Sequence, residues 1–259
     1  MTLRETLLKA RENKKAAFIP FIMAGDPTAE ETVKSIIALE KAGADALELG
    51  VPFSDPVADG ETVQRAAERA LKSGMTLDGV LDVVKEARKQ GVKIPICLFS
   101  YLNPIYKKGY AGFISAAQDA GVNGALIVDL PPEEAEDYVD AAQEKSFETV
   151  FLCSPTTTPA RLKRVDAATT GFVYYVSREG VTGAQATLAG GTAEKLAQLK
   201  TELQNPVAVG FGISTPEHVK ALSGIADGIV VGSSLIKAAA GAENPASILA
   251  EKVEWLKTG

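Results

Sequence analysis

The chain has 259 residues, of which 46% are hydrophobic, and a formal net charge of −6 at pH 7. This length fits one or two domains and is common for a single α/β barrel, and the hydrophobic share is enough for a sizeable core. The negative charge argues against nucleic acid or an anionic membrane as partner, whereas a small phosphorylated ligand is compatible with it because helix N-termini bind phosphate locally.

The first 15 residues are charged and lack the apolar segment of a signal peptide, and no later run approaches a membrane span. Cys97 and Cys153 lie in separate apolar segments, so we interpret them as core thiols in a reducing compartment and expect a cytoplasmic protein. His218 is the only histidine. This excludes Ser-His-Asp triads and most histidine-ligated metal sites, so we expect no metal and assign catalysis to carboxylates, Tyr, Lys or backbone groups.

The apolar periodicity predicts a leading helix over 2–13 and then strands that alternate with helices. Strands are expected at 16–25, 46–51, 94–101, 124–130, 148–154, 171–177, 206–212 and 227–233. Helices are expected at 28–43, 61–72, 77–90, 110–120, 131–145, from 159, at 192–203, after 215 and around 245. Thr28 and Glu31 have the spacing of a capping box at the start of the first of these.

A short phrase recurs in which a helix ends at Gly and an apolar strand follows within a few residues: KAGADALELG, DAGVNGALIVD and LSGIADGIVVG. Such repetition is typical of βα units. With no break in composition, it predicts an α/β protein: a single (β/α)8 TIM barrel over residues 1–259 with an extra N-terminal helix. A doubly wound open sheet is the alternative, disfavoured because no dinucleotide fingerprint follows the first strand.

Two carboxylates stand out in the stretch 45–64, DALELGVPFSDPVADGETVQ. Glu48 alternates with Leu47 and Leu49, which places it on the inner face of a strand near the carboxyl end, where a carboxylate is unfavourable without a use or a partner. Asp59 follows in a loop rich in Pro, Asp and Gly and is a possible partner in acid–base chemistry. Alternatively, Glu48 is a structural carboxylate hydrogen-bonded to a neighbour such as Tyr174.

Two glycine-rich turns follow the last two strands, VGFGIST (209–215) and VVGSSL (230–235). Backbone N–H groups at such helix starts bind phosphate, and the position after strands seven and eight is the usual phosphate site of this fold. Inward-facing aromatic residues of strands one, three and six either fill the barrel or hold a flat apolar group; they are Phe21, Phe99, Tyr101, Phe172 and Tyr174. The alternation of residues around Asp129 predicts that its side chain supports a loop.

Motifs along essentially the whole chain carry a resemblance to a known family. They are GDPT (25–28), LELGVPFSDPVADGETVQ (47–64), SYLNP (100–104), VDLPPEE (128–134), SREGVTGA (177–184) and VGFGIST (209–215). The sequence resembles the tryptophan synthase α subunit family. The resemblance implies a barrel lyase of tryptophan biosynthesis that cleaves indole-3-glycerol phosphate into indole and glyceraldehyde 3-phosphate. It also implies an αββα complex in which indole passes through a tunnel to a β subunit carrying pyridoxal phosphate, with no cofactor in this chain.

Matched by motif, the resemblance implies that Glu48 and Asp59 are catalytic, that Tyr174 lies beside the glutamate and that Thr182 belongs to a lid. The implied phosphate contacts are Gly183, Gly212, Ser214, Gly232 and Ser233. The implied indole pocket is formed by Phe21, Phe99, Leu126, Val128 and Phe211. Asp55 and Pro56 match the loop that faces the β subunit.

Other functions stay open at this point. A free-standing indole-3-glycerol phosphate lyase would share the catalytic residues and differ only in its activity without a partner. A catalytically silent subunit that stimulates the β subunit allosterically is disfavoured because both carboxylates are present. A barrel isomerase acting on another sugar phosphate would need no apolar pocket the size of indole.

Overall fold

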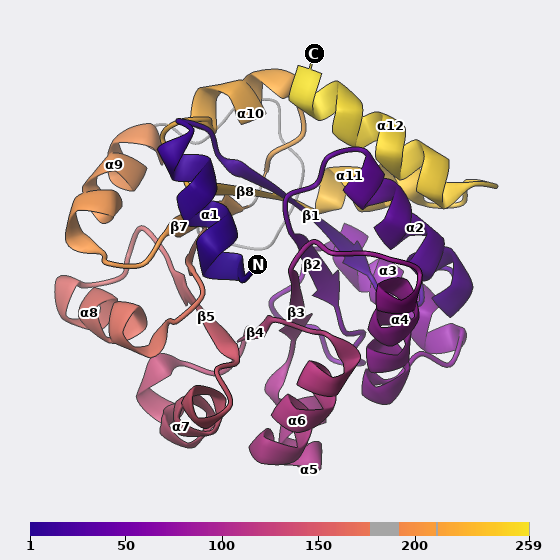
Figure 1. The fold of residues 1–259 in the computed structure, drawn as a ribbon, viewed down its shortest axis with the longest axis horizontal. Helices are drawn as coiled ribbons and strands as arrows, with labels where there is room; N and C mark the ends of the chain where they lie inside the picture. The colour runs from indigo at the N-terminus through magenta and orange to yellow at the C-terminus, as the bar shows by residue number, and fades with distance from the viewer. Residues whose placement is uncertain (177–191, 211, 259) are drawn as a thin grey trace.

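The chain folds into a closed barrel of parallel strands surrounded by helices in the computed structural model, which describes residues 1–176, 192–210 and 212–258 (Figure 1). Within these ranges the strands pair in chain order from β1 to β8, and β8 closes the barrel on β1. They are β1 (Ala17–Met23), β2 (Leu47–Gly50), β3 (Ile96–Ser100), β4 (Gly124–Ile127), β5 (Glu148–Cys153), β6 (Val173–Val176), β7 (Val207–Gly210) and β8 (Gly228–Val231). The predicted (β/α)8 barrel is confirmed.

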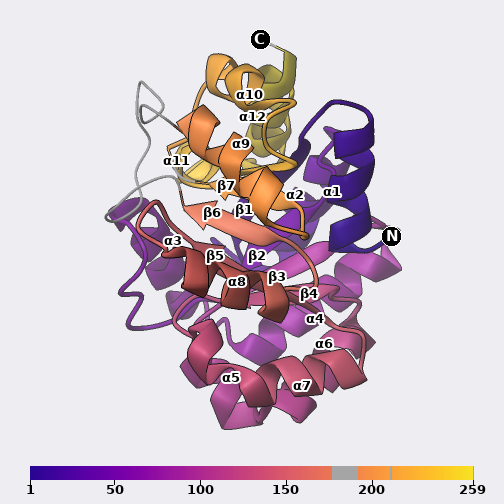
Figure 2. The same ribbon diagram turned by 90° about the vertical axis from the view of Figure 1, so that its left-hand side faces the viewer.

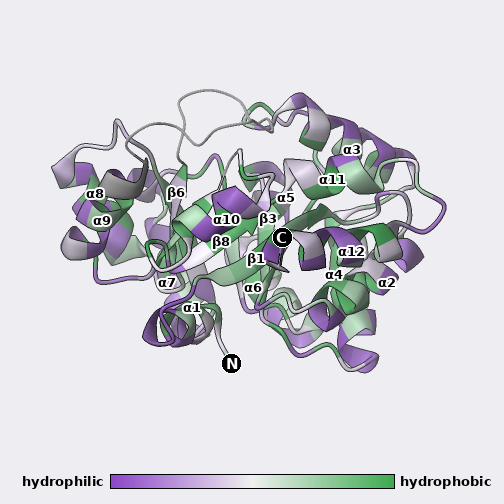
Figure 3. Ribbon diagram, turned by 90° about the horizontal axis from the view of Figure 1, so that it is seen from above, coloured by the Kyte–Doolittle hydropathy of each residue, from purple (hydrophilic) through white to green (hydrophobic). Residues whose placement is uncertain are grey.

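The helices cover the outside of the barrel, with hydrophilic residues toward solvent and hydrophobic residues toward the strands (Figure 3). They are α1 (Leu3–Glu12), α2 (Ala29–Lys41), α3 (Glu61–Lys72), α4 (Leu77–Lys89), α5 (Leu102–Lys108), α6 (Tyr110–Ala120), α7 (Glu136–Glu144), α8 (Pro159–Ala168), α9 (Thr192–Glu202), α10 (Pro216–Leu222), α11 (Ser233–Ala239) and α12 (Pro245–Thr258), with a 3-10 turn η1 (Pro132–Glu134). Figure 2 shows α8 and α9 over the strands β5 to β7.

Most predicted helices are present with ends that differ by a few residues, and two differ in kind. Helix α5 was not predicted. Its first N–H, on Leu102, donates to Asp129 Oδ1 at 2.7 Å, so a residue from the turn after β4 stabilises the helix start, and no local pattern reveals that. Asp129 therefore supports the start of a helix, where a loop was predicted. The predicted helix over 131–145 is split into η1 and α7.

Threonine hydroxyl groups cap the N-termini of several of the helices. Thr28 accepts a hydrogen bond from the Glu31 N–H, as its spacing predicts. The second half of the predicted capping box is wrong, because the Glu31 carboxylate accepts from Lys34. A complete capping box forms instead between Thr2 and Glu5 at the start of α1. Each cap satisfies an N–H group that has no partner inside its helix.

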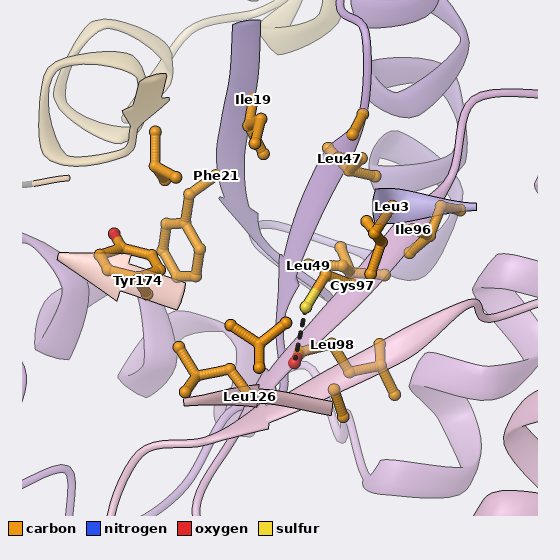
Figure 4. Packing of buried hydrophobic residues seen from close by; sticks show 14 of the residues in the cluster. Leu3, Ile19, Phe21, Leu47, Leu49, Ile96, Cys97, Leu98, Leu126 and Tyr174 are labelled. Atoms are coloured by element: carbon orange, nitrogen blue, oxygen red, sulfur yellow. Dashed lines mark hydrogen bonds between the residues drawn. The ribbon is translucent and has the colours of Figure 1, made fainter. Parts of the chain in front are cut away.

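Helix α1 lies across the end of the barrel where the strands begin (Figure 1). Leu3 and Leu7 are fully buried, and Leu3 points toward Ile96 and Cys97 in the barrel interior (Figure 4). Glu148 accepts from the Leu3 and Arg4 N–H groups at 2.7 and 2.8 Å, which caps the start of α1. With this end closed, the opposite end of the barrel is left to the site.

Candidate active site

One cavity at the carboxyl ends of the strands brings together several of the predicted site residues. Glu48 lies on β2 in register with Phe21 of β1 and Cys97 of β3, so all three side chains face the barrel interior. Phe21 and Tyr174 point into the same region of the interior (Figure 4). The cavity is lined by Phe21, Glu48, Asp59, Val63, Phe99, Tyr174, Gly212, Ile213, Val230, Gly232 and Ser233.

Glu48 is held in an environment that favours the protonated acid. Glu48 is only 1% exposed to solvent. Within the described parts of the chain, its Oε1 atom is buried without a hydrogen-bond partner. Burial raises the pKa of Glu48 to about 8, and the negative charge of Asp59 contributes to the shift. A carboxyl group with one unpaired buried oxygen facing a cavity is suited to exchange a proton with a bound molecule.

Asp59 reaches the cavity from the loop between β2 and α3 and is 4% exposed. Its backbone is held by the side-chain amide of Gln64, which donates to the Asp59 carbonyl at 2.8 Å. Burial raises the pKa of Asp59 to about 6, and a hydrogen bond with Tyr101 works in the opposite direction. Near neutral pH, Asp59 is therefore the ionised member of the pair and Glu48 the protonated one.

Tyr174 lies on β6, fully inside the barrel, and depends on a glycine of the next strand. A Cβ atom at Gly210 would overlap the hydroxyl group and two ring carbons of Tyr174. The absence of a side chain at this point of β7 therefore gives the tyrosine its place beside Glu48.

The predicted phosphate contacts fall into three groups. Gly212, with φ 79°, together with Gly232 and Ser233, lines the cavity. Ser214 is not among its lining residues, and its N–H donates to His218 Nδ1 at 3.4 Å. Gly183 lies outside the described residues, as does the predicted lid residue Thr182.

Two of the aromatic residues predicted for the indole pocket line the apolar part of the cavity. Phe21 and Phe99 line it with their rings edge to face, 5.4 Å between centroids. Leu126 is buried and in register with Phe99, but neither it nor Val128 is among the lining residues. Phe211 lies outside the described residues.

Three lining residues were not predicted: Val63, Ile213 and Val230. The alternation along β8 carries a signal for Val230, whereas Val63 lies on the first turn of α3 and reaches the cavity only through the path of the preceding loop.

The loop predicted to face a partner is at the surface. Asp55 is exposed and accepts a hydrogen bond from the Ser54 hydroxyl at 2.5 Å, and Pro56 is partly buried. Val57, next along the chain, is 79% exposed. An exposed apolar residue beside an exposed acid is compatible with a docking surface.

Among the described residues, no group of three or more His, Cys, Asp or Glu could hold a metal ion. The helices of residues 1–176, 192–210 and 212–258 include none long and apolar enough to cross a membrane.

Barrels of this topology carry their active sites at the carboxyl ends of the strands, and here that end holds two carboxyl groups with separated pKa values. Fold and site together define a barrel enzyme whose candidate active site is built around two buried carboxyl groups. Residues 7–258 match the family model described as tryptophan synthase alpha chain. The chain belongs to the tryptophan synthase alpha chain family and is a carbon–carbon lyase of tryptophan biosynthesis.

The sequence aligns with curated relatives over most of their length. The tryptophan synthase alpha chain of Laribacter hongkongensis is 48% identical over 244 residues, covering 93% of this chain and 92% of the relative. That of Geotalea daltonii is 47% identical over 232 residues, covering 90% of this chain and 88% of the relative.

Solved structures give the same result. Tryptophan synthase subunit alpha from Legionella pneumophila superposes with a TM-score of 0.90 at 38% identity, covering 99% of this chain and 97% of that one. A chain from the tryptophan synthase a2b2 complex of Pyrococcus furiosus, a structure concerned with mutual activation, has a TM-score of 0.88 at 43% identity, covering 93% of this chain and 98% of that one.

Proposed function

We propose that this chain cleaves indole-3-glycerol phosphate into indole and glyceraldehyde 3-phosphate in a retro-aldol reaction centred on Glu48 and Asp59. The observation that carries the proposal is the buried Glu48 carboxyl group, whose Oε1 has no partner among the described residues and whose pKa is raised to about 8. A general acid that also serves as a base after losing its proton needs a pKa near the working pH.

The proton balance of the reaction can be followed at Glu48. The protonated acid gives its proton to C3 of the indole ring, which forms an indolenine and leaves Glu48 ionised. The carboxylate then takes the proton of the glycerol hydroxyl next to the bond that breaks. The oxygen electrons form the aldehyde, the electron pair of the broken carbon–carbon bond restores the aromatic ring, and Glu48 is again protonated.

Asp59 supplies the fixed negative charge. Its carboxylate accepts the indole N–H and stabilises the positive charge that develops on the ring when C3 is protonated. Tyr174, packed beside Glu48, holds the acid in position. The family resemblance adds Thr182 as a lid residue that contacts Asp59 and excludes water.

The remaining cavity residues bind the two ends of the substrate. Phe21 and Phe99 offer aromatic faces and edges to the indole ring, and by resemblance Leu126, Val128 and Phe211 complete that pocket. The backbone at Gly212, Gly232 and Ser233 approaches the cavity without bulky side chains and holds the phosphate, with Ser214 and Gly183 added by resemblance.

We further propose that the chain works in the cytoplasm in an αββα complex with a β subunit that carries pyridoxal phosphate, while this chain itself uses no cofactor. The Pyrococcus furiosus relative belongs to an a2b2 complex. The exposed segment with Asp55, Pro56 and Val57 is the surface that we assign to the β subunit.

The test is indole release from indole-3-glycerol phosphate by the purified chain, with and without a β subunit. We expect slow turnover that rises strongly when the partner is added. Fast turnover that the partner does not change would point to a free-standing lyase. No release under either condition, with the β reaction still stimulated, would point to a silent allosteric subunit.

A further inference from the structure

A second tyrosine, outside the cavity lining, contacts the loop that carries Asp59. Tyr101 follows β3 directly, and the residue is 2% exposed. Its hydroxyl oxygen accepts a hydrogen bond from the Ala58 N–H at 3.0 Å, and the same hydroxyl group is near enough to the Asp59 carboxylate to lower the pKa of that group. One phenol group therefore binds the backbone just before Asp59 and favours the charged form of the Asp59 side chain.

The Tyr101 ring is itself held from the surface side. Phe53, in the exposed loop after β2, stacks on it with 5.1 Å between ring centroids and 28° between the ring planes. Phe53 is partly exposed, whereas Tyr101 is buried. The stacked pair therefore links the surface segment next to Asp55 with the interior position of Asp59.

The loop needs such a contact because, among the described residues, backbone pairing with β3 reaches only its start, where the Val51 N–H donates to the Phe99 carbonyl at 2.8 Å. Between β2 and α3 its internal bonds are short-range: the Asp59 N–H donates to the Pro56 carbonyl at 3.0 Å, and the Val57 N–H donates to the Asp55 carbonyl at 2.9 Å. Gln64 adds a contact from α3. Within the described residues, Tyr101 contacts the part of the loop around Asp59 from the end of β3, and it therefore helps to fix that part relative to the rest of the site.

We propose that Tyr101 is a positioning residue for Asp59 and that stacking by Phe53 holds Tyr101 in the required orientation. The proposal rests on the proposed function, because it concerns the ionised Asp59 in cleavage of indole-3-glycerol phosphate. Without the phenol hydroxyl, Asp59 loses a neighbouring polar group that favours its charged form and the Ala58 N–H loses its acceptor. Both changes weaken the fixed negative charge that the transition state requires.

The titratable groups that face Asp59 come from three strands. Glu48 on β2 and Tyr174 on β6 both interact with its charge, and the Tyr101 hydroxyl after β3 lies near it. Asp129, after β4, acts on Tyr101 in turn. Of these groups Tyr101 is the one that favours the ionised form of Asp59, so its removal raises the pKa of Asp59 above its present value of about 6.

The experiment compares indole release by the full chain and by Tyr101→Phe across the pH range. We expect kcat to fall about tenfold or more while KM changes by less than about threefold, since the contact acts on charge that develops in the transition state. We also expect the acid limb of the kcat/KM profile to move to higher pH. Phe53→Leu should change both quantities in the same direction by a smaller amount.

The matched control is Tyr106→Phe on α5, because this tyrosine is 68% exposed, and it should behave as the parent chain does. An unchanged kcat and acid limb in Tyr101→Phe would overturn the proposal, and so would a lower kcat with the acid limb in place. If the parent chain releases no indole at any pH, the proposed function fails instead, and the two failures are thereby distinguished.

Discussion

The negative charge of Asp59 raises the pKa of Glu48, which burial has already shifted upward. The two carboxyl groups therefore titrate apart, Asp59 at a pKa of about 6 and Glu48 at a pKa of about 8. Between these values Glu48 keeps its proton while Asp59 is ionised. That is the combination from which the proposed reaction starts.

We expect the kcat/KM of indole formation to follow a bell-shaped pH profile. Activity should decline below about pH 6, where Asp59 takes up a proton, and above about pH 8, where Glu48 has lost its own. Initial rates of indole release measured from about pH 5 to about pH 9 at constant ionic strength give the profile. A rate that is flat over this range would contradict the assignment of either carboxyl group.

Glu48→Gln should abolish cleavage while leaving the fold intact. The amide has the shape of the acid but neither donates a proton to C3 nor takes one from the hydroxyl, so kcat should fall by a factor of about 10⁴ or more. Stopped assays for indole, with circular dichroism to verify the fold, measure the loss. Glu144→Gln on the exposed end of α7 is the matched control and should keep full activity. Retained turnover in Glu48→Gln would remove Glu48 from the mechanism.

The same variant should change how stability depends on pH. Because the folded-state pKa of Glu48 lies above its unfolded value of about 4.5, the parent chain loses stability as pH rises from about 4.5 to about 8. At pH 7 this loss in the free energy of unfolding is about 3 kcal/mol. The Glu48→Gln variant does not show it, because glutamine does not titrate. Urea unfolding at several pH values should therefore show the stability difference moving in favour of Glu48→Gln as pH rises through this window. A difference independent of pH would show that Glu48 is ionised in the folded protein.

The sequence predicts the barrel and the centre of the site because both depend on local alternation. The strand around Glu48 places its side chain opposite to Leu47 and Leu49, and the structure has it inside the barrel at the cavity. The strand order follows from regular alternation with helices, which leaves few topologies. Glycine turns after the last two strands predict cavity backbone at Gly212 and Gly232, as found.

What the sequence does not reveal depends on contacts between distant segments. The first N–H of helix α5 donates to the carboxylate of Asp129, and Tyr101 binds the backbone just before Asp59. Both contacts form only when the barrel closes. Ile213 enters the cavity through the course of a turn, for which periodicity has no signal. The interior has room for Tyr174 because residue 210 of β7 is a glycine. The sequence of either strand alone does not predict this dependence of one strand on the other.

Gly210→Ala should displace Tyr174 and thereby impair the site. The new methyl group would overlap the tyrosine hydroxyl, so we expect a stability loss of about 1–3 kcal/mol from overpacking together with a lower kcat. Gly112→Ala on α6 is the matched control, because a Cβ there meets nothing within 4 Å, and it should stabilise the helix by up to about 1 kcal/mol. Thermal unfolding and indole release of both variants decide the matter; full activity of Gly210→Ala would show that Tyr174 is not needed where it lies.

Asp227→Asn should destabilise the closed end of the barrel without changing the chemistry. The carboxylate is fully buried before β8 and binds Arg11 of α1 at 2.8 and 2.5 Å and Lys200 of α9 at 2.8 Å. Burial alone would raise the pKa of Asp227, but the hydrogen bonds from Arg11, Lys200 and the Val207 N–H outweigh it and lower the pKa. The substitution leaves two cations without their anion, so we expect the free energy of unfolding to fall by about 2 kcal/mol at neutral pH. The loss is no larger because both cations reach solvent.

The pH dependence of this loss gives a separate test. A carboxylate whose folded-state pKa is lowered stabilises the protein above its unfolded pKa of about 3.9 and loses that contribution as pH falls below it. The parent chain and Asp227→Asn should therefore differ in urea midpoint at pH 7 and converge on acidification. Asp140→Asn, an exposed position on α7, is the control and should match the parent throughout. A difference that persists unchanged into acid would mean that Asp227 acts by packing and not through its charge.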